Sequence, residues 1–125
     1  MAYILLIDDA NSMRELLPMH LKRHGHELAV AEDAIEGIKS ILSRAPDLIV
    51  SDLQMPYMDG LELLKAIRGD DQSKQIPVIM LTSNQDDEKW MDAMKSGVTD
   101  YLLKPVAIGE LVKAINKALR GRKSQ

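Results

Sequence analysis

Short apolar runs alternate with stretches of helical periodicity along the whole chain, and this alternation limits the folds that the chain can adopt. The runs are Tyr3–Ile7, a weaker Glu27–Ala31, Leu48–Val50, Val78–Leu81 and Tyr101–Leu103. Short continuous apolar runs are typical of strands that are buried on both faces of a parallel sheet. Strand and helix alternate five times, which predicts right-handed crossovers between parallel strands. The predicted fold is therefore α/β, a (βα)5 doubly wound five-stranded parallel sheet with helices on both faces.

Apolar residues recur at spacings of three and four between these runs, as on the buried face of a helix. The stretches are Met13–Leu21, Ile35–Leu42, Leu61–Ile67, Met91–Met94 and Leu111–Leu119. Pro18 lies inside the first stretch and is expected to kink that helix. Methionines at helical spacing are expected to fill the core, so Met91 and Met94 should form the buried stripe of the fourth helix. Trp90 would then project outward, toward a partner.

Length and composition narrow the class of protein. The chain has 125 residues, a formal net charge of −3 and no cysteine. One domain is expected over residues 1–121, followed by a polar tail at 122–125. The absence of cysteine excludes disulfides and thiolate chemistry, and the mild acidic excess argues against direct binding of nucleic acid. No apolar run is long enough to span a membrane and no signal peptide is visible, so we expect no membrane association and a cytoplasmic location.

Polar side chains stand where four of the five predicted strands end. Asp8 and Asp9 follow the first run, Asp52 the third, Thr82 the fourth and Lys104 the fifth. The second run is followed by Glu32 and Asp33, without a comparable isolated group. A strand order of 2-1-3-4-5 explains this difference, because it places the second strand at the edge of the sheet. The carboxyl ends of the strands form the ligand-binding edge of open α/β sheets. We therefore expect these side chains to meet in one cleft.

The residue types in this cleft indicate phosphoryl transfer. Three carboxylates close together raise one another's pKa or recruit a cation. An all-oxygen site with few protein ligands suits Mg²⁺, which often bridges a carboxylate and a phosphate. Lys104 adds a compact positive charge for an incoming anion, and Thr82 adds a hydroxyl donor. An ionised aspartate is an accepted nucleophile for forming an aspartyl phosphate.

Four segments of the chain resemble the receiver domains of two-component response regulators, in particular the single-domain CheY type. The segments are Ile4–Asp9, Pro46–Pro56 with Asp59 and Gly60, Pro77–Ser83, and Gly97–Pro105. They occur in the order of the family and at compatible spacing, and the resemblance covers essentially the whole chain. It implies the flavodoxin-like or CheY-like version of the predicted fold. Val98, in place of the usual alanine, and Pro18 depart from the family pattern, but neither lies in the acidic cluster.

The resemblance implies a role for each residue of the cleft. Asp52 would be the phosphoacceptor, and Lys104 would contact the phosphoryl group after a cis peptide bond to the following proline. Mg²⁺ would be bound directly by Asp9 and by the phosphoacceptor, through water by Asp8, and by the backbone carbonyl of Gln54.

The resemblance also implies a switch. Thr82 would move toward the phosphoryl group, and Tyr101 would turn inward behind it. The face formed by the fourth helix, the fifth strand and the fifth helix, with Trp90 exposed on it, would then bind a downstream protein. The phosphoryl group would come from a histidine kinase, a phosphotransfer protein or a small phosphodonor, in chemotaxis or a phosphorelay. Gln54 and Asn84 would influence the lifetime of the phosphorylated state, and we expect no enzyme that turns over a separate substrate.

Three alternatives stay open. A Mg²⁺-dependent phosphatase of the haloacid-dehalogenase type also uses an aspartate nucleophile, but usually places it after the first strand as Asp-x-Asp and carries a cap domain. A flavodoxin-like flavin binder needs a phosphate loop at the position where Asp8 and Asp9 would repel a phosphate. The chain could also be a receiver excised from a larger regulator.

Overall fold

The sheet has the predicted strands in the predicted order. A computed structural model describes residues 2–8, 11–83 and 86–123. Its five strands are β1 (Tyr3–Ile7), β2 (Glu27–Ala31), β3 (Leu48–Asp52), β4 (Val78–Thr82) and β5 (Asp100–Leu103). They form one parallel sheet in the order β2-β1-β3-β4-β5. The doubly wound α/β fold predicted from the sequence is therefore confirmed.

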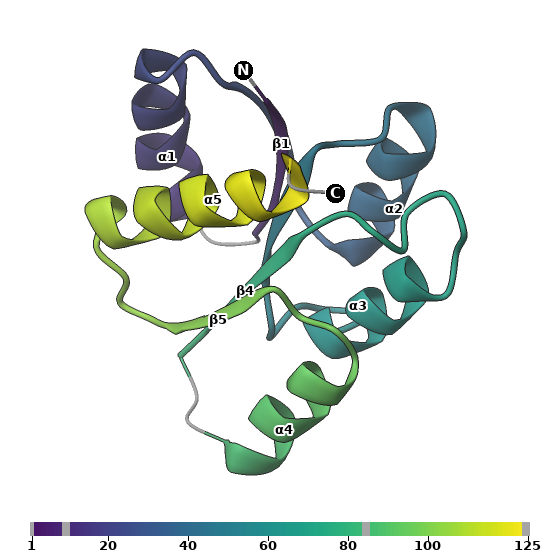
Figure 1. The fold of residues 1–125 in the computed structure, drawn as a ribbon. Coiled ribbons are helices and arrows are strands. Elements are labelled where there is room, and N and C mark those ends of the chain that lie inside the picture. The colour runs from purple at the N-terminus through teal and green to yellow at the C-terminus, as the bar shows by residue number, and fades with distance from the viewer. Residues whose placement is uncertain (1, 9–10, 84–85, 124–125) are drawn as a thin grey trace.

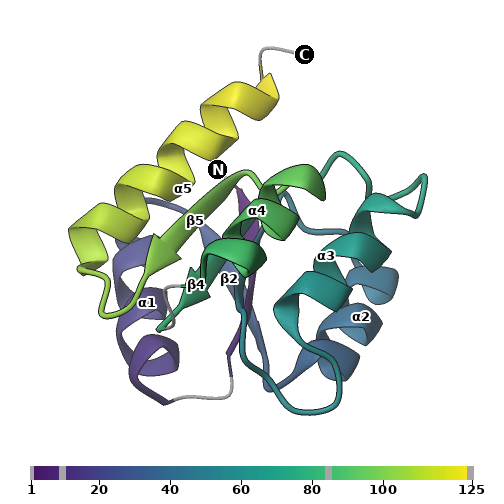
Figure 2. The same ribbon diagram turned by 90° about the horizontal axis from the view of Figure 1, so that it is seen from below.

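Helices cover both faces of the sheet. They are α1 (Asn11–Arg23), α2 (Ala34–Ser43), α3 (Gly60–Arg68), α4 (Asp87–Lys95) and α5 (Ile108–Lys123). α1 and α5 lie on one face, and α2, α3 and α4 lie on the other (Figure 1 and Figure 2). α1 is continuous through Pro18, so the proline does not end the helix, and α5 continues two residues beyond the expected domain boundary at residue 121. Among the described residues, no helix is both long and apolar enough to cross a bilayer.

Two apolar layers explain why the strands read as continuous apolar runs. Ile4 and Leu6 of β1 pack into the layer beneath α1 and α5. Leu5 and Ile7 point the other way, into the layer beneath α2, α3 and α4. Successive side chains of a strand point to opposite faces, so a strand covered on both faces needs apolar residues at every position.

Strand register brings the ends of the strands to one edge of the sheet. Ile7 pairs with Ser51 of β3, and Thr82 pairs with Leu103. The backbone N–H of Lys104 donates to the carbonyl of Thr82 at 2.7 Å, which extends this alignment beyond β5. Asp52 and Thr82 are the last residues of their strands rather than the first residues after them. Their backbones are therefore fixed by the sheet.

The prediction that large apolar residues form the buried faces of α2 and α4 is wrong in part. Met91 and Met94 are 52% and 46% exposed, and the residue that α4 buries is Ala93. In α2, Leu42 is 73% exposed and Ile35 is 44% exposed. The buried residues of α2 are small, Ala34 and Gly37, and a Cβ added to Gly37 would lie 2.5 Å from the side chain of Ile7. Small residues of α2 thus make the closest approach to the sheet, while Ile38 and Ile41 are partly buried and pack against the same apolar layer. In α4 the two methionines remain largely exposed. Met80 in β4 does fill the core.

Candidate functional site

Three charged side chains meet at the carboxyl edge of the sheet. Asp52 ends β3 and is 4% exposed, and Asp8 follows β1 and is 1% exposed. Lys104 follows β5, and its Nζ forms an ion pair with Oδ1 of Asp52. Asp8 and Asp52 come from the adjacent strands β1 and β3, and Lys104 follows β5, which is separated from β3 by β4, as in the predicted strand order. The site therefore joins two buried carboxylates and one ammonium group.

The positive charge of Lys104 does not offset the effects that disfavour an ionised Asp52. Burial and, after it, a hydrogen bond with Asp8 raise the pKa of Asp52 from its ordinary value of 3.8 to about 7, against the opposite effect of Lys104. Desolvation and a like charge both disfavour the ionised carboxylate. A single ammonium group does not compensate for them, so the site favours a further cation.

The donor set suits a hard divalent cation such as Mg²⁺, which prefers oxygen ligands. Within the described residues no group of three or more His, Cys, Asp or Glu side chains gathers at one point. The two carboxylates of Asp8 and Asp52 are therefore the acidic part of the site that the structure describes. Asp9, the expected direct ligand, lies outside the described residues, as does Asn84.

Thr82 and Gln54 lie side by side at the rim of this site. The hydroxyl of Thr82 donates to Oε1 of Gln54 at 3.2 Å. The Tyr101 hydroxyl is buried, and burial together with Asp86 raises the pKa of this phenol, while Thr82 lowers it. The Tyr101 ring is thus directed inward, on the side of Thr82. The peptide bond between Lys104 and its proline is cis, as the family resemblance implied.

The loop after β3 is closed directly against Asp52. The N–H of Gly60 donates to the carbonyl of Leu53 at 2.8 Å, and Asp59 caps α3 in a capping box with Glu62. A Cβ added to Gly60 would lie 2.5 Å from the backbone oxygen of Asp52 and 2.6 Å from the sulfur of Met80. The sequence contained Gly60 only as part of a motif. Its structural role, which is to let α3 begin against the end of β3, is evident only in the folded chain.

Gly60→Ala is expected to destabilise the fold, because the methyl group meets backbone that the sheet holds in place. Overpacking of this kind costs about 1–3 kcal/mol. Gly109→Ala is the matched control: Gly109 lies in α5 with nothing within 4 Å of an added Cβ. Alanine in an open helical position is expected to stabilise by about 0.5–1 kcal/mol. Urea unfolding of both variants checks the pair, and equal stabilities would contradict the close approach of Gly60.

Two other hollows lie away from the carboxylates. One, of about 470 Å³, is lined by Asp86, Asp87, Trp90, Tyr101 and Leu103 between α4 and β5. It lies on the face expected to bind a partner, and Trp90 is 45% exposed there.

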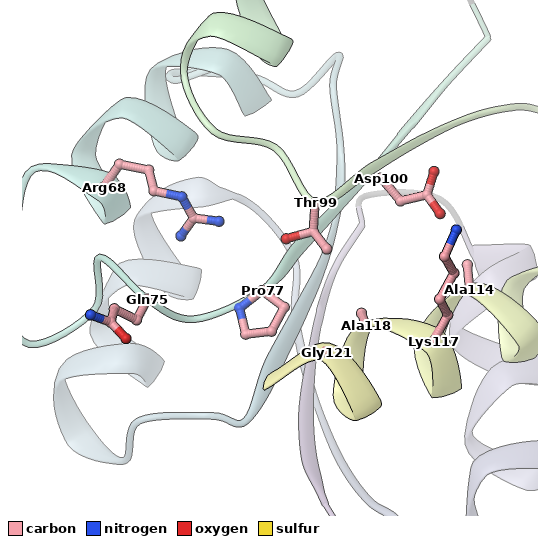
Figure 3. Close-up of a pocket in the computed structure, with 9 residues that line it drawn as sticks. All are labelled: Arg68, Gln75, Pro77, Thr99, Asp100, Ala114, Lys117, Ala118 and Gly121. Atoms are coloured by element: carbon pink, nitrogen blue, oxygen red, sulfur yellow. The ribbon is translucent and has the colours of Figure 1, made fainter. Parts of the chain in front are cut away.

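The other hollow lies at the opposite, amino edge of the sheet and measures about 360 Å³. Figure 3 shows Arg68 on one side and Lys117 of α5 directed toward Asp100 on the other. Arg68 donates to the carbonyls of Ile76 and Gly97, at 2.6 and 3.0 Å. Its guanidinium group therefore ties loops together at the edge remote from Asp52.

Comparison with known proteins shows the class to which this fold and site belong. The family described as the response regulator receiver domain matches residues 4–116. The chain belongs to this family, and the resemblance noted in the sequence is confirmed.

Similar solved structures have the same overall fold. A response regulator receiver domain protein from Clostridium thermocellum is 31% identical, with a TM-score of 0.88 and coverage of 98% of both chains. The Vibrio cholerae chemotaxis protein CheY4 is 34% identical, with a TM-score of 0.87 over 94% of this chain and 98% of that one. The transcriptional regulatory protein AfsQ1 of Streptomyces coelicolor is 38% identical over 120 residues, which are 96% of this chain and 52% of the relative. The chain thus spans about half the length of the curated relatives that it matches.

Proposed function

We propose that this receiver domain accepts a phosphoryl group on Asp52 in a Mg²⁺-dependent reaction. The observation that carries the proposal is the buried Asp52 carboxylate, which lies between Asp8 and the ammonium group of Lys104 at the carboxyl edge of the sheet. The Mg²⁺ ion would be held by Asp8, Asp9, Asp52 and the backbone carbonyl of Gln54. When bound, it would neutralise the carboxylates and the oxygens of the phosphoryl group.

The chain's own residues supply the nucleophile and part of the charge compensation. An oxygen of Asp52 attacks the phosphorus of the donor, a P–O bond to the carboxylate forms, and the bond between phosphorus and the leaving group breaks. Lys104 is paired with the carboxylate beforehand. Because the acyl phosphate moves the negative charge outward onto the phosphoryl oxygens, the Lys104 ammonium group can follow it. An ammonium group that already lies beside the carboxylate stabilises this charge with little reorganisation at the moment of reaction.

Thr82 would connect the phosphoryl group to the partner face. Its hydroxyl now donates to Gln54, and a phosphoryl oxygen would compete for that hydrogen bond. Movement of Thr82 would change the space beside the inward Tyr101 ring, which lines the hollow with Trp90 and Leu103. Phosphorylation would thereby shift an existing equilibrium by the difference in its interactions with the two states, typically about 1–3 kcal/mol. Gln54 and Asn84 are proposed to influence the rate of hydrolysis.

The partners of the domain are inferred by class. Receiver domains work with histidine kinases and downstream effectors, so we infer a histidine kinase or a phosphotransfer protein as donor and a protein as target. The similar proteins include both a chemotaxis protein and a transcriptional regulatory protein, which supports either output. The receiver would occupy residues 1–121, alone or as part of a longer regulator.

Incubation with radiolabelled phosphoramidate tests the proposal. We expect label to enter the chain only when Mg²⁺ is present, and hydroxylamine to release it, because hydroxylamine cleaves acyl phosphates. Label that enters without Mg²⁺, or resists hydroxylamine, would contradict the proposal. Many turnovers on small phosphate esters would instead favour a phosphatase.

Trp90→Ala is expected to weaken binding of the phosphorylated domain to its downstream protein about tenfold or more, because exposed tryptophans contribute strongly to interfaces. Phosphate incorporation should be spared. Met19→Ala on α1 is the matched control, since Met19 is 55% exposed and lies on a helix of the other face. Calorimetric titration measures both affinities. Equal affinities for the two variants would show that Trp90 does not contribute to binding of the partner.

A further inference from the structure

Tyr57 has a backbone conformation that is unfavourable for an aromatic residue. It is the only non-glycine among the described residues with positive φ, at 73°. The N–H of Met58 donates to the carbonyl of Pro56 at 2.8 Å, which closes a γ-turn around Tyr57. The γ-turn with positive φ is the rare and strained form. The surrounding loop therefore holds Tyr57 in place at some loss of stability.

Burial inside the domain does not compensate for this strain. It is 81% exposed, more than any other exposed large apolar side chain of the described residues. Residues held in strained conformations cluster at functional sites. A glycine or asparagine would take the same conformation with less strain, so burial within this domain does not explain the tyrosine.

The loop places Tyr57 at the rim of the phosphoacceptor site. Gly60 is fixed against the backbone of Asp52, as described above. Tyr57 precedes Gly60 by three residues, so their Cα atoms are at most about 11 Å apart even in a fully extended chain. Gln54 in the same loop is exposed as well. We therefore expect a protein that reaches the nearly buried Asp52 to contact this rim.

We propose that Tyr57 is a docking and specificity residue for the protein that carries the phosphohistidine donor. This inference rests on the proposed function of Asp52. During transfer the P–N bond to the donor histidine breaks and the P–O bond to Asp52 forms, and the imidazole leaves neutral when its other ring nitrogen carries a proton. A histidine on a protein brings a surface with it, against which an ordered tyrosine ring can pack. The γ-turn holds the backbone in advance, which reduces the entropy lost on binding, and tyrosines are enriched among the residues that dominate interfaces.

A small phosphodonor should make little use of Tyr57, because it can reach Asp52 without covering the rim. The test therefore compares two donors: a radiolabelled phosphotransfer domain selected for transfer to the wild-type chain, and phosphoramidate. For Tyr57→Asn and Tyr57→Gly we expect a higher melting temperature, because the strain is relieved. The rate of transfer from the protein donor, relative to the rate from phosphoramidate, should fall about tenfold. We expect this fall because the half-saturating concentration of the protein donor rises. Tyr57→Phe should retain most of the transfer.

Leu42→Asn is the matched control. Leu42 is 73% exposed near the end of α2, away from the carboxyl edge of the sheet, and its replacement should leave the ratio of the two rates unchanged. An unchanged ratio for Tyr57→Asn would overturn the proposal, as would an equal fall with both donors. A wild-type chain that takes phosphate from neither donor would instead refute the proposed function, and the docking role with it.

Discussion

Asp52→Asn is expected to reduce Mg²⁺-dependent incorporation of phosphate to background. The Asp52 carboxylate is the nucleophile of the proposed reaction, and a carboxamide has neither its charge nor its ability to form an acyl phosphate. Asparagine has nearly the same shape as aspartate, so the packing at this 4% exposed position should be preserved. Incorporation of label from phosphoramidate, followed by peptide mapping, measures the effect.

Asp71→Asn is the control for this experiment. Asp71 lies in the loop after α3, its side chain is 94% exposed, and it pairs only loosely with Lys74 at 3.1 Å. The control should incorporate phosphate like the wild type, with the label on the peptide that contains Asp52. Retained incorporation in Asp52→Asn, with the label at an unmoved position, would show that another residue is the phosphoacceptor.

The architecture could be predicted because the physical constraint acts on every residue of the strands. A strand such as β1 sends Ile4 and Leu5 into different apolar layers, so its whole sequence must be apolar, and the pattern is visible without coordinates. The strand order followed from a second observation: β2 is followed by Glu32 and Asp33, and not by an isolated polar group comparable to those at the ends of the other strands. Both observations depend only on residue type and position.

The buried faces of α2 and α4 could not be predicted by the same reasoning. Periodicity is judged from large apolar residues, whereas the fully buried positions of these helices are taken by small ones such as Gly37 and Ala93, and a large residue such as Ile38 is only partly buried. The size of a side chain in such a contact depends on the distance between helix and sheet, which the sequence does not contain. For that reason Met91 and Met94 were expected in the core and lie at the surface.

The members of the candidate site could be predicted, but their partners could not. The carboxyl ends of parallel strands share one edge of the sheet, and Asp8, Asp52 and Lys104 lie together there. The pairing of Thr82 with Gln54 depends on side-chain rotamers. The strained turn at Tyr57 depends on how the loop closes over Asp52, and only its coordinates reveal the positive φ.

Stability of the metal-free chain should fall as pH rises through the titration of Asp52. The unfolded chain ionises this carboxyl near its ordinary value of 3.8, while the folded chain does so near 7. Between these values the folded state binds more protons, so the free energy of unfolding decreases with increasing pH. The full penalty is present above pH 7 and amounts to at most about 4 kcal/mol, at about 1.4 kcal/mol per unit of pKa.

Asp52→Asn should therefore stabilise the metal-free chain, and the gain over wild type should widen from about pH 4 to pH 7 and then level off. Titrating groups remote from the site contribute equally to both proteins, so the difference between the two urea midpoints reports on Asp52 together with its partners Asp8 and Lys104. At pH 8, Mg²⁺ should stabilise the wild type more than Asp52→Asn, because an ion that binds only the folded state adds its binding free energy to stability. Asp71→Asn, whose carboxylate is exposed, should follow the wild type at every pH. A difference in stability between wild type and Asp52→Asn that does not change with pH would contradict this prediction. It would mean that the acidic cleft does not disfavour the charge of Asp52, and the electrostatic argument for a bound cation would then fail.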